Sequence, residues 1–218
     1  MNFIQLQELL LKFGIKTNIS RDGTSIDTKY DKYQDYEILI RNKENFEYGV
    51  MHQERQPVPY FGCEKKFTNI NEATKYVFID ILSSEYKVGK LLGTEFRKTL
   101  SIDVYKKQFD VEEFKKLMIE NNISTDLLVL DKKDIKKQRG VLLVRNEKNN
   151  YCNAFIDKYG GIVKFYELYF QEDILFHIYK EIFALNFFEK EVIPKLKEMN
   201  IYNEFTEEDI ISVCILNI

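Results

Sequence analysis

Two histidines are the residues best suited to acid–base chemistry in this chain of 218 residues. His52 falls on an expected strand, close to Glu54 and Arg55. Side chains two positions apart on a strand share a face, so His52 and Glu54 would point together while Arg55 opposes them. This arrangement permits a general acid or base at His52. A polar surface cluster at the end of a strand is the commoner explanation.

The other residues that could do chemistry are scattered. His177 falls on the polar side of an expected long helix, with Asp173 and Lys180, and we interpret it as a solvated surface residue. No group of His, Cys, Asp and Glu has the spacing of a zinc site, and the chain has no Gly-x-Gly-x-x-Gly or Walker-type loop. The sequence therefore predicts no catalytic residue, no metal ligand and no cofactor-binding residue.

Basic residues gather in two segments, Lys132–Arg139 and Lys87–Lys107. The second holds six bases and two acids, or 6 − 2 = +4. Either segment could bind phosphate groups. Together they define an alternative function, a nucleic-acid-binding or phage-related regulatory protein that uses residues 87–107 and 132–139. For Lys132–Arg139 the simpler interpretation is an exposed loop between strands.

The whole chain is acidic, with a net charge of −3. From Glu167 to Asp209 there are eleven acids and four lysines, or 4 − 11 = −7. Such a protein is poorly suited to binding nucleic acid, because neutralisation of phosphates supplies most of that affinity. It suits a basic protein partner better, since complementary fields speed encounter. The same acids would also fit the solvated faces of exposed helices.

Cysteine use and hydropathy predict a cytoplasmic protein. Cys63, Cys152 and Cys214 are odd in number and far apart, which favours reduced thiols over a disulfide framework. No apolar run approaches the roughly 20 residues that span a bilayer. The segment Met1–Glu8 lacks the basic lead-in of a signal peptide. We therefore expect no membrane partner.

Two polar stretches, Arg41–Asn45 and Arg145–Asn149, organise the elements that must position these residues. Each lies between two apolar or aromatic runs, and their spacing is 145 − 41 = 104 residues. We interpret both as hairpin turns in which Asn tolerates unusual backbone angles. Apolar residues upstream also recur, at an offset of 108: Phe3, Leu6, Leu9 and Ile15 against Val111, Phe114, Leu117 and Ile123.

The repeated pattern predicts an α+β fold of two tandem units, each with a helix, a three- to four-stranded antiparallel sheet and a second helix. We place the first unit at residues 1–86, a connecting and partly helical segment at 87–109, and the second unit with an extra C-terminal helix at 110–218. The expected strands are 36–41, 46–51, 60–67, 126–130, 141–145, 151–156 and 162–170. The expected long helix spans 171–191, and Pro194 allows a break after it.

One stretch resembles a known family. Phe46–Arg55 is an aromatic strand that ends in Glu-Arg, and it is followed by Tyr60-Phe61 and by Asn71-Glu72-Ala73 at the start of an aromatic helix. This order is similar to small immunity proteins of bacterial polymorphic-toxin systems. The resemblance implies a cytosolic protein that neutralises a cognate secreted toxin by covering it and has no chemistry of its own. The second unit departs from the pattern, with Ile156-Asp157-Lys158 at the Glu-Arg position.

Charge and a proline-marked loop suggest where such a toxin would bind. The expected partner-binding residues are Asp35, Glu37, Glu54, Arg55 and Tyr60, with Glu172 and Asp173 as a second possibility. The many tyrosines could serve as interface anchors, although antiparallel sheets require the same alternation. A small hydrolase centred on His52 and Glu54 is the less favoured alternative.

Overall fold

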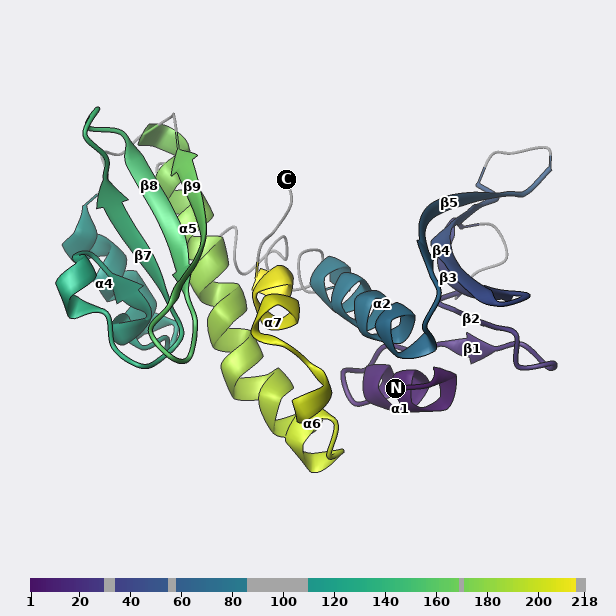
Figure 1. Cartoon of the computed structure of the whole chain (residues 1–218). Coiled ribbons are helices and arrows are strands. Elements are labelled where there is room, and N and C mark those ends of the chain that lie inside the picture. Colours follow the sequence, from purple (N-terminus) through teal and green to yellow (C-terminus); the bar gives the residue numbers. More distant parts are fainter. Residues whose placement is uncertain (30–33, 55–57, 86–109, 169–170, 215–218) are drawn as a thin grey trace. The chain divides into compact units, whose positions relative to one another are not determined.

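A computed structural model of the chain describes residues 1–29, 34–54, 58–85, 110–168 and 171–214. The chain divides into two compact units, residues 1–84 with 195–205 and residues 85–194 with 206–218. Both units combine helices with a sheet, so the fold is α+β (Figure 1). The predicted connecting segment at 87–109 lies outside the described residues.

Helix α1, Phe3–Leu11, opens the first unit. Asn2 caps it in a capping box: the Asn2 side chain accepts the N–H of Gln5, and the Gln5 side chain accepts the N–H of Asn2. Gly14, at φ +78°, turns the chain away after the last turn of the helix. One face of the helix is buried and consists of Phe3, Leu6, Leu9 and Leu10.

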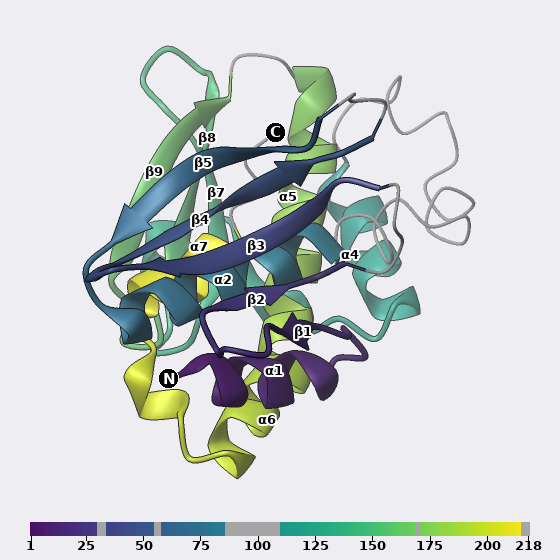
Figure 2. The ribbon, with the colours of Figure 1, turned by 90° about the vertical axis from the view of Figure 1, so that its right-hand side faces the viewer.

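The first unit holds a five-stranded antiparallel sheet, sheet A, with strands in sequence order (Figure 2). Its strands are β1 (Asn18–Ile19), β2 (Ser25–Asp27), β3 (Tyr36–Asn42), β4 (Asn45–His52) and β5 (Tyr60–Phe67). The hairpin expected at Arg41–Asn45 is confirmed, since Asn42 pairs with Asn45. Its left-handed residue is Lys43, at φ +55°, rather than an asparagine.

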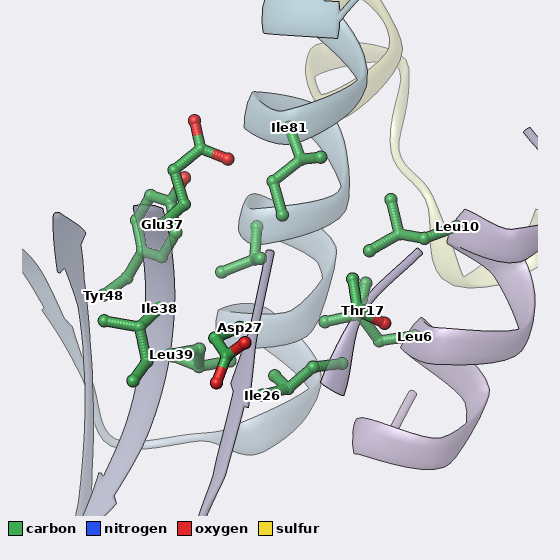
Figure 3. Close-up of a pocket in the computed structure, with 11 residues that line it drawn as sticks. Leu6, Leu10, Thr17, Ile26, Asp27, Glu37, Ile38, Leu39, Tyr48 and Ile81 are labelled. Atoms are coloured by element: carbon green, nitrogen blue, oxygen red, sulfur yellow. The ribbon is translucent and has the colours of Figure 1, made fainter. Parts of the chain in front are cut away.

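Helix α2, Ile70–Glu85, packs on one face of sheet A. Directly paired residues point to the same side of a sheet, so Ile26, Leu39 and Tyr48 form one row toward the helix. Figure 3 shows Leu6 and Leu10 of α1 and Ile81 of α2 converging on this row. The space between these side chains has no room for a water molecule. A tightly filled apolar layer therefore supports sheet A from this side.

Residues 195–205 return to the first unit and complete its core. They include the end of α6, Ile193–Glu198. The ring of Phe205 lies 5.8 Å from that of Phe78 on α2, and the Lys195 ammonium lies 4.3 Å from the centre of the Phe13 ring. The buried residues of this segment are Leu196, Ile201 and Phe205.

The second unit begins with α4, Val111–Glu120, which Asp110 caps by accepting the N–H groups of Glu112 and Glu113. Sheet B follows in the order β6 (Leu128–Val129), β7 (Gly140–Arg145), β8 (Tyr151–Ile156) and β9 (Ile162–Leu168). Helix α5, Gln171–Phe187, packs against this sheet and against α4, with the rings of Phe114 and Tyr179 6.0 Å apart. Helix α7, Glu207–Cys214, ends the described chain.

The helix expected to break near Pro194 instead continues. A π-helical segment, Phe188–Val192, follows α5 directly, and α6 includes Pro194 in its first turn. Because the helix is continuous, Pro194 removes one backbone N–H donor from it. The wider π turn adjusts the backbone before the proline.

Two details of the predicted sheets are wrong. Sheet A has five strands rather than three or four, because the chain around Asp22-Gly23 adds two short ones. Sheet B is mixed, since β6 pairs with β7 in parallel. A 3₁₀ turn at Thr125–Leu127 takes up the first two residues of the strand expected at 126–130, and β6 covers only Leu128–Val129. The connection between Val129 and Gly140 then lets the chain re-enter in the same direction, as parallel pairing requires.

The two sheets share a β-bulge but not the same packing. It falls between Tyr48 and Gly49 in β4 and between Ala154 and Phe155 in β8, so each bulge starts three residues into its strand (48 − 45 and 154 − 151). However, α2 contacts β4 at the fourth strand residue, Tyr48, whereas α5 contacts β8 at the third strand residue, Asn153. The predicted repetition of one unit is therefore not confirmed.

Gly49 should be indispensable to sheet A. A Cβ atom there would lie 2.0 Å from the backbone carbonyl oxygen of Gly62, which cannot move without deforming β5. Overpacking of this kind costs about 1–3 kcal/mol, and occasionally more. We expect Gly49→Ala to lower the free energy of unfolding in urea by about 3 kcal/mol. Gly62→Ala is the matched control, because its Cβ would come no closer than 3.1 Å to any atom, at the end of the His52 side chain, and would stay 3.6 Å from the backbone carbonyl of Val50. Equal stability of the two variants would contradict this account.

Candidate functional site

Asp35 fixes the chain where β4 ends. One of its carboxylate oxygens accepts the backbone N–H groups of Gln53 at 2.7 Å and Glu54 at 2.8 Å, and the other lies 3.0 Å from Nδ1 of His52. The N–H groups of Glu54 and Gln53, and then His52, lower the pKa of Asp35 below its ordinary value. The carboxylate is therefore ionised at neutral pH and holds three consecutive residues.

His52 in turn positions Tyr60. The two residues are paired across β4 and β5, and their rings stack with centroids 4.8 Å apart and planes 30° apart. The imidazole also lies against Gly62, where a side chain would displace it. Tyr60 remains 53% exposed, although its ring is held on one side. We call the group Asp35, His52, Glu54 and Tyr60 the His52 end of sheet A.

Further carboxylates lie on the same face of the sheet, around Tyr48. The Tyr48 hydroxyl donates to Asp80 of α2 at 2.8 Å. Burial, and then the negative charges of Glu37, Asp80 and Glu64, raise the pKa of Tyr48 above its ordinary value. Figure 3 shows Glu37 beside the Tyr48 ring, at the margin of the apolar layer. The helix-facing side of sheet A is thus apolar at its centre and acidic toward the His52 end.

The opposite side of sheet A, its outer face, is apolar and partly exposed. Tyr36, Met51 and Phe61 form one cross-strand row, and Ile38 and Ile40 lie on the same face. All are half-buried except Ile38, which is 7% exposed. Glu47 and Lys66 form an ion pair at 2.9 Å farther along this face. The rows reach the same end of the sheet as Asp35 and Tyr60.

The structure brings together most of the site residues predicted in the first unit. Asp35, Glu54 and Tyr60 meet at the His52 end, and Glu37 lies on the adjoining face. Arg55 lies outside the described residues. Glu172 and Asp173 fall in the first turn of α5, in the second unit, and their side chains lie outside the described part.

The strand that was expected to align His52 with Glu54 ends before it reaches Glu54. Strand β4 ends at His52, so the strand geometry that would align the two side chains does not extend to Glu54. The ring bonds Asp35 instead, which sequence reasoning placed only among partner contacts. The sequence does carry a signal for this contact. Strands β3 and β4 are antiparallel, so the start of β3 lies beside the end of β4, and the polar stretch Gln34-Asp35 directly precedes β3.

Arg139 is a second polar centre, in the second unit. It was expected on an exposed loop, but its side chain is only 4% exposed. Its guanidinium donates to both oxygens of Glu207, at 2.8 and 2.6 Å, and to Glu189 at 2.5 Å, and Lys158 also pairs with Glu207 at 3.0 Å. Burial raises the pKa of Glu207, but the hydrogen bonds from Arg139 and Lys158 outweigh it, so the net shift is downward.

Within the described ranges, no cluster of three or more His, Cys, Asp and Glu residues is arranged to hold a metal ion. None of the helices in those ranges is long and apolar enough to cross a membrane. The chain matches no protein family, no curated protein and no solved structure.

The downward-shifted pKa of Asp35 makes a pH-dependent prediction. A carboxyl whose pKa is lower in the folded state contributes its contacts above the unfolded value of about 3.9 and loses them as pH falls through the folded value. We expect the amide signals of Gln53 and Glu54 to shift together in NMR spectra over that acidic range. In Asp35→Asn the same two signals should not follow this transition. The same transition in Asp35→Asn would contradict this account.

Removing Arg139 should destabilise the second unit. Arg139→Met would leave two carboxylates without their main partner, and breaking such a buried pair costs about 3–5 kcal/mol. Arg145→Met is the matched control, since Arg145 is exposed on the β7–β8 hairpin, and it should cost less than about 1 kcal/mol. Urea denaturation measures both. A double variant, Arg139→Met with Glu207→Gln, should recover part of the loss; equal effects of the two arginine variants would contradict the buried cluster.

Proposed function

We propose that this chain is a non-enzymatic, cytoplasmic immunity protein that neutralises a cognate bacterial toxin by covering it. The supporting observation is the His52 end, where a held but half-exposed tyrosine lies among ionised carboxylates. The resemblance of Phe46–Arg55 and the following elements to immunity proteins supplies the particular class of partner. Neither the His52 end nor the resemblance requires the chain to catalyse a reaction.

Tyr60 has the properties of a binding anchor. Aromatic side chains dominate interface energies, especially where they are immobilised before binding. Stacking on His52 removes part of the rotational freedom of Tyr60, and Asp35 holds His52 in place. Binding that buries the exposed face of Tyr60 would therefore cost little conformational entropy of this side chain.

The charge around the anchor favours a basic partner. Asp35 and Glu54 are exposed at the His52 end, and Glu37 lies half-buried on the adjoining face. Carboxylates on one side of an interface speed the approach of a positively charged protein and disfavour acidic ones. A toxin that acts on nucleic acid would carry such a positive surface at its active site.

The outer face of sheet A offers further area for docking. A stable complex of this kind buries about 800 Å² per partner, which is more than one tyrosine and its neighbours supply. The half-buried row Tyr36, Met51 and Phe61 continues from the same end of the sheet. A toxin that spans this end could contact both faces.

Nucleic-acid binding is the second candidate function, and the exposed lysines of the basic segment Lys132–Arg139 favour it. Lys132, Lys133, Lys136 and Lys137 are all exposed. Aspartates are interleaved with them, and Asp126 pairs with Lys136 at 3.0 Å, which weakens the positive field. Filter binding of DNA and RNA at two ionic strengths distinguishes this candidate, because phosphate binding weakens steeply with salt.

We also propose that the two units descend from one duplicated unit. Their first helices end alike, with Gly14 and Asn122 in left-handed conformation. The next residues, Ile15 and Ile123, bond back to the carbonyls of Leu10 and Met118, at a constant offset of 108. The shared β-bulges add support. Divergence after duplication would account for the different helix packing on the two sheets.

The immunity function predicts that a toxin domain is encoded beside the gene, and co-expression with such a domain tests it. We expect co-expression of the chain to restore growth of cells that produce this domain. Tyr60→Ala should weaken binding about 30-fold, equivalent to an anchor of about 2 kcal/mol, and Glu54→Lys should slow association. Isothermal titration and stopped-flow kinetics measure the two effects. Glu147→Lys, on the exposed tip of the β7–β8 hairpin, is the charge control and should bind normally.

Glu172→Lys separates the two predicted contact regions. If the second possibility is right, this variant weakens binding while Glu54→Lys does not. Unchanged affinity in Tyr60→Ala, Glu54→Lys and Glu172→Lys would remove both placements. Failure of the wild-type chain to bind or protect against the neighbouring toxin domain would remove the immunity function itself.

A further inference from the structure

A pocket of about 370 Å³ lies within the second unit and is independent of the His52 end. Its volume falls in the range of small-molecule sites. Six of its seven lining residues carry polar side chains; the lining consists of Ser124, Asp126, Leu127, Gln138, Arg139, Lys158 and Glu189.

The walls of the pocket are held by contacts that do not need a ligand. Arg139 is clamped by Glu189 and by Glu207, which lies outside the lining. The Gln138 side chain donates to the backbone carbonyl of Asp126 at 3.2 Å. Glu189 projects from the π-helical segment, a type of turn that is often found at functional sites. Arg139 and Gln138 are thus held in place before binding.

Every charge identified in the lining already has an opposite charge nearby. Arg139 pairs with Glu189, Lys158 with Glu207, and Asp126 with Lys136. A charged ligand would have to separate one of these pairs, and the pair at Arg139 is expensive to break because the guanidinium is buried. A neutral ligand needs no separation, because a carboxylate can accept several hydrogen bonds at once. The electrostatics therefore select a neutral, hydrogen-bonding molecule.

The hydrogen-bond donors and acceptors of the lining narrow the chemical class of the ligand further. Each hydroxyl both donates and accepts, which matches a wall where the carboxylate of Asp126 lies near the Gln138 amide and Ser124 hydroxyl. Apolar atoms, including those of Leu127, also make up much of the lining, which suits the C–H face of a saturated ring. We propose that the pocket binds a small neutral polyhydroxylated molecule of the sugar class.

The test uses the full chain and defined probes. D-glucose, D-ribose and N-acetyl-D-glucosamine are titrated separately and followed by NMR, with glycine as a zwitterionic probe and inorganic phosphate as an anionic one. At least one sugar should saturate with a Kd of about 1 mM or tighter, and the shifted signals should include Gln138 and Lys158. Glycine and phosphate should not saturate.

Two variants locate the binding. Asp126→Asn and Lys158→Met should each weaken sugar binding about tenfold, the effect of losing one hydrogen bond to a charged group. Asp134→Asn and Lys132→Met, exposed residues outside the lining, are the matched controls and should leave affinity unchanged. The Asp126 side chain is 61% exposed, so the folding of Asp126→Asn is not in question. The proposal is overturned if no sugar binds, if glycine or phosphate binds instead, or if both variants bind sugar like the controls.

Discussion

The contacts of the Asp35 carboxylate determine the geometry at the end of sheet A. Two backbone N–H groups and one imidazole converge on this side chain, and hydrogen bonds to an ionised acceptor are roughly twice as strong as neutral ones. Because Asp35 is itself exposed, these contacts add little to the stability of the whole unit. Their effect is positional: they set where the chain leaves β4, and through His52 they set the orientation of Tyr60.

Local interactions explain why much of the fold could be predicted from sequence. A cap or a turn depends on a few neighbouring residues, so Asn69, Asp110 and Thr206 each mark a helix start, and each side chain accepts a nearby backbone N–H. The bounds of β5 and β8 agree with the alternation of the sequence. Proximity of Asp35 to Glu54 and Tyr60 could also be inferred, because the two strands of a hairpin bring their distant ends together.

Interactions between distant segments explain the errors. The parallel direction of β6 depends on the course of a ten-residue connection, from Leu130 to Arg139, and not on the two residues of the strand. In the sequence, Arg139 belongs to a basic segment that is expected to be exposed. Its main partner, Glu207, lies 68 residues later in the chain. The buried pair between Asn153 and Glu181 could not be predicted from the sequence either, because Asn and Glu are residue types that are usually exposed. Such contacts exist only once helices have docked on a sheet.

The two units use carboxylates in opposite ways, and this difference separates the two proposed binding surfaces. In the second unit, Glu189 and Glu207 pair with the buried guanidinium of Arg139. The opposite charges cancel, so little electrostatic field from these carboxylates reaches a ligand. In the first unit, Asp35 obtains most of its hydrogen bonds from neutral backbone N–H groups, which hold the carboxylate without cancelling its charge. Its field therefore extends to solvent over roughly a Debye length of 8–10 Å. Long-range attraction of a charged protein is a property suited to the His52 end, whereas the pocket beside Arg139 can discriminate only by direct hydrogen bonding and shape.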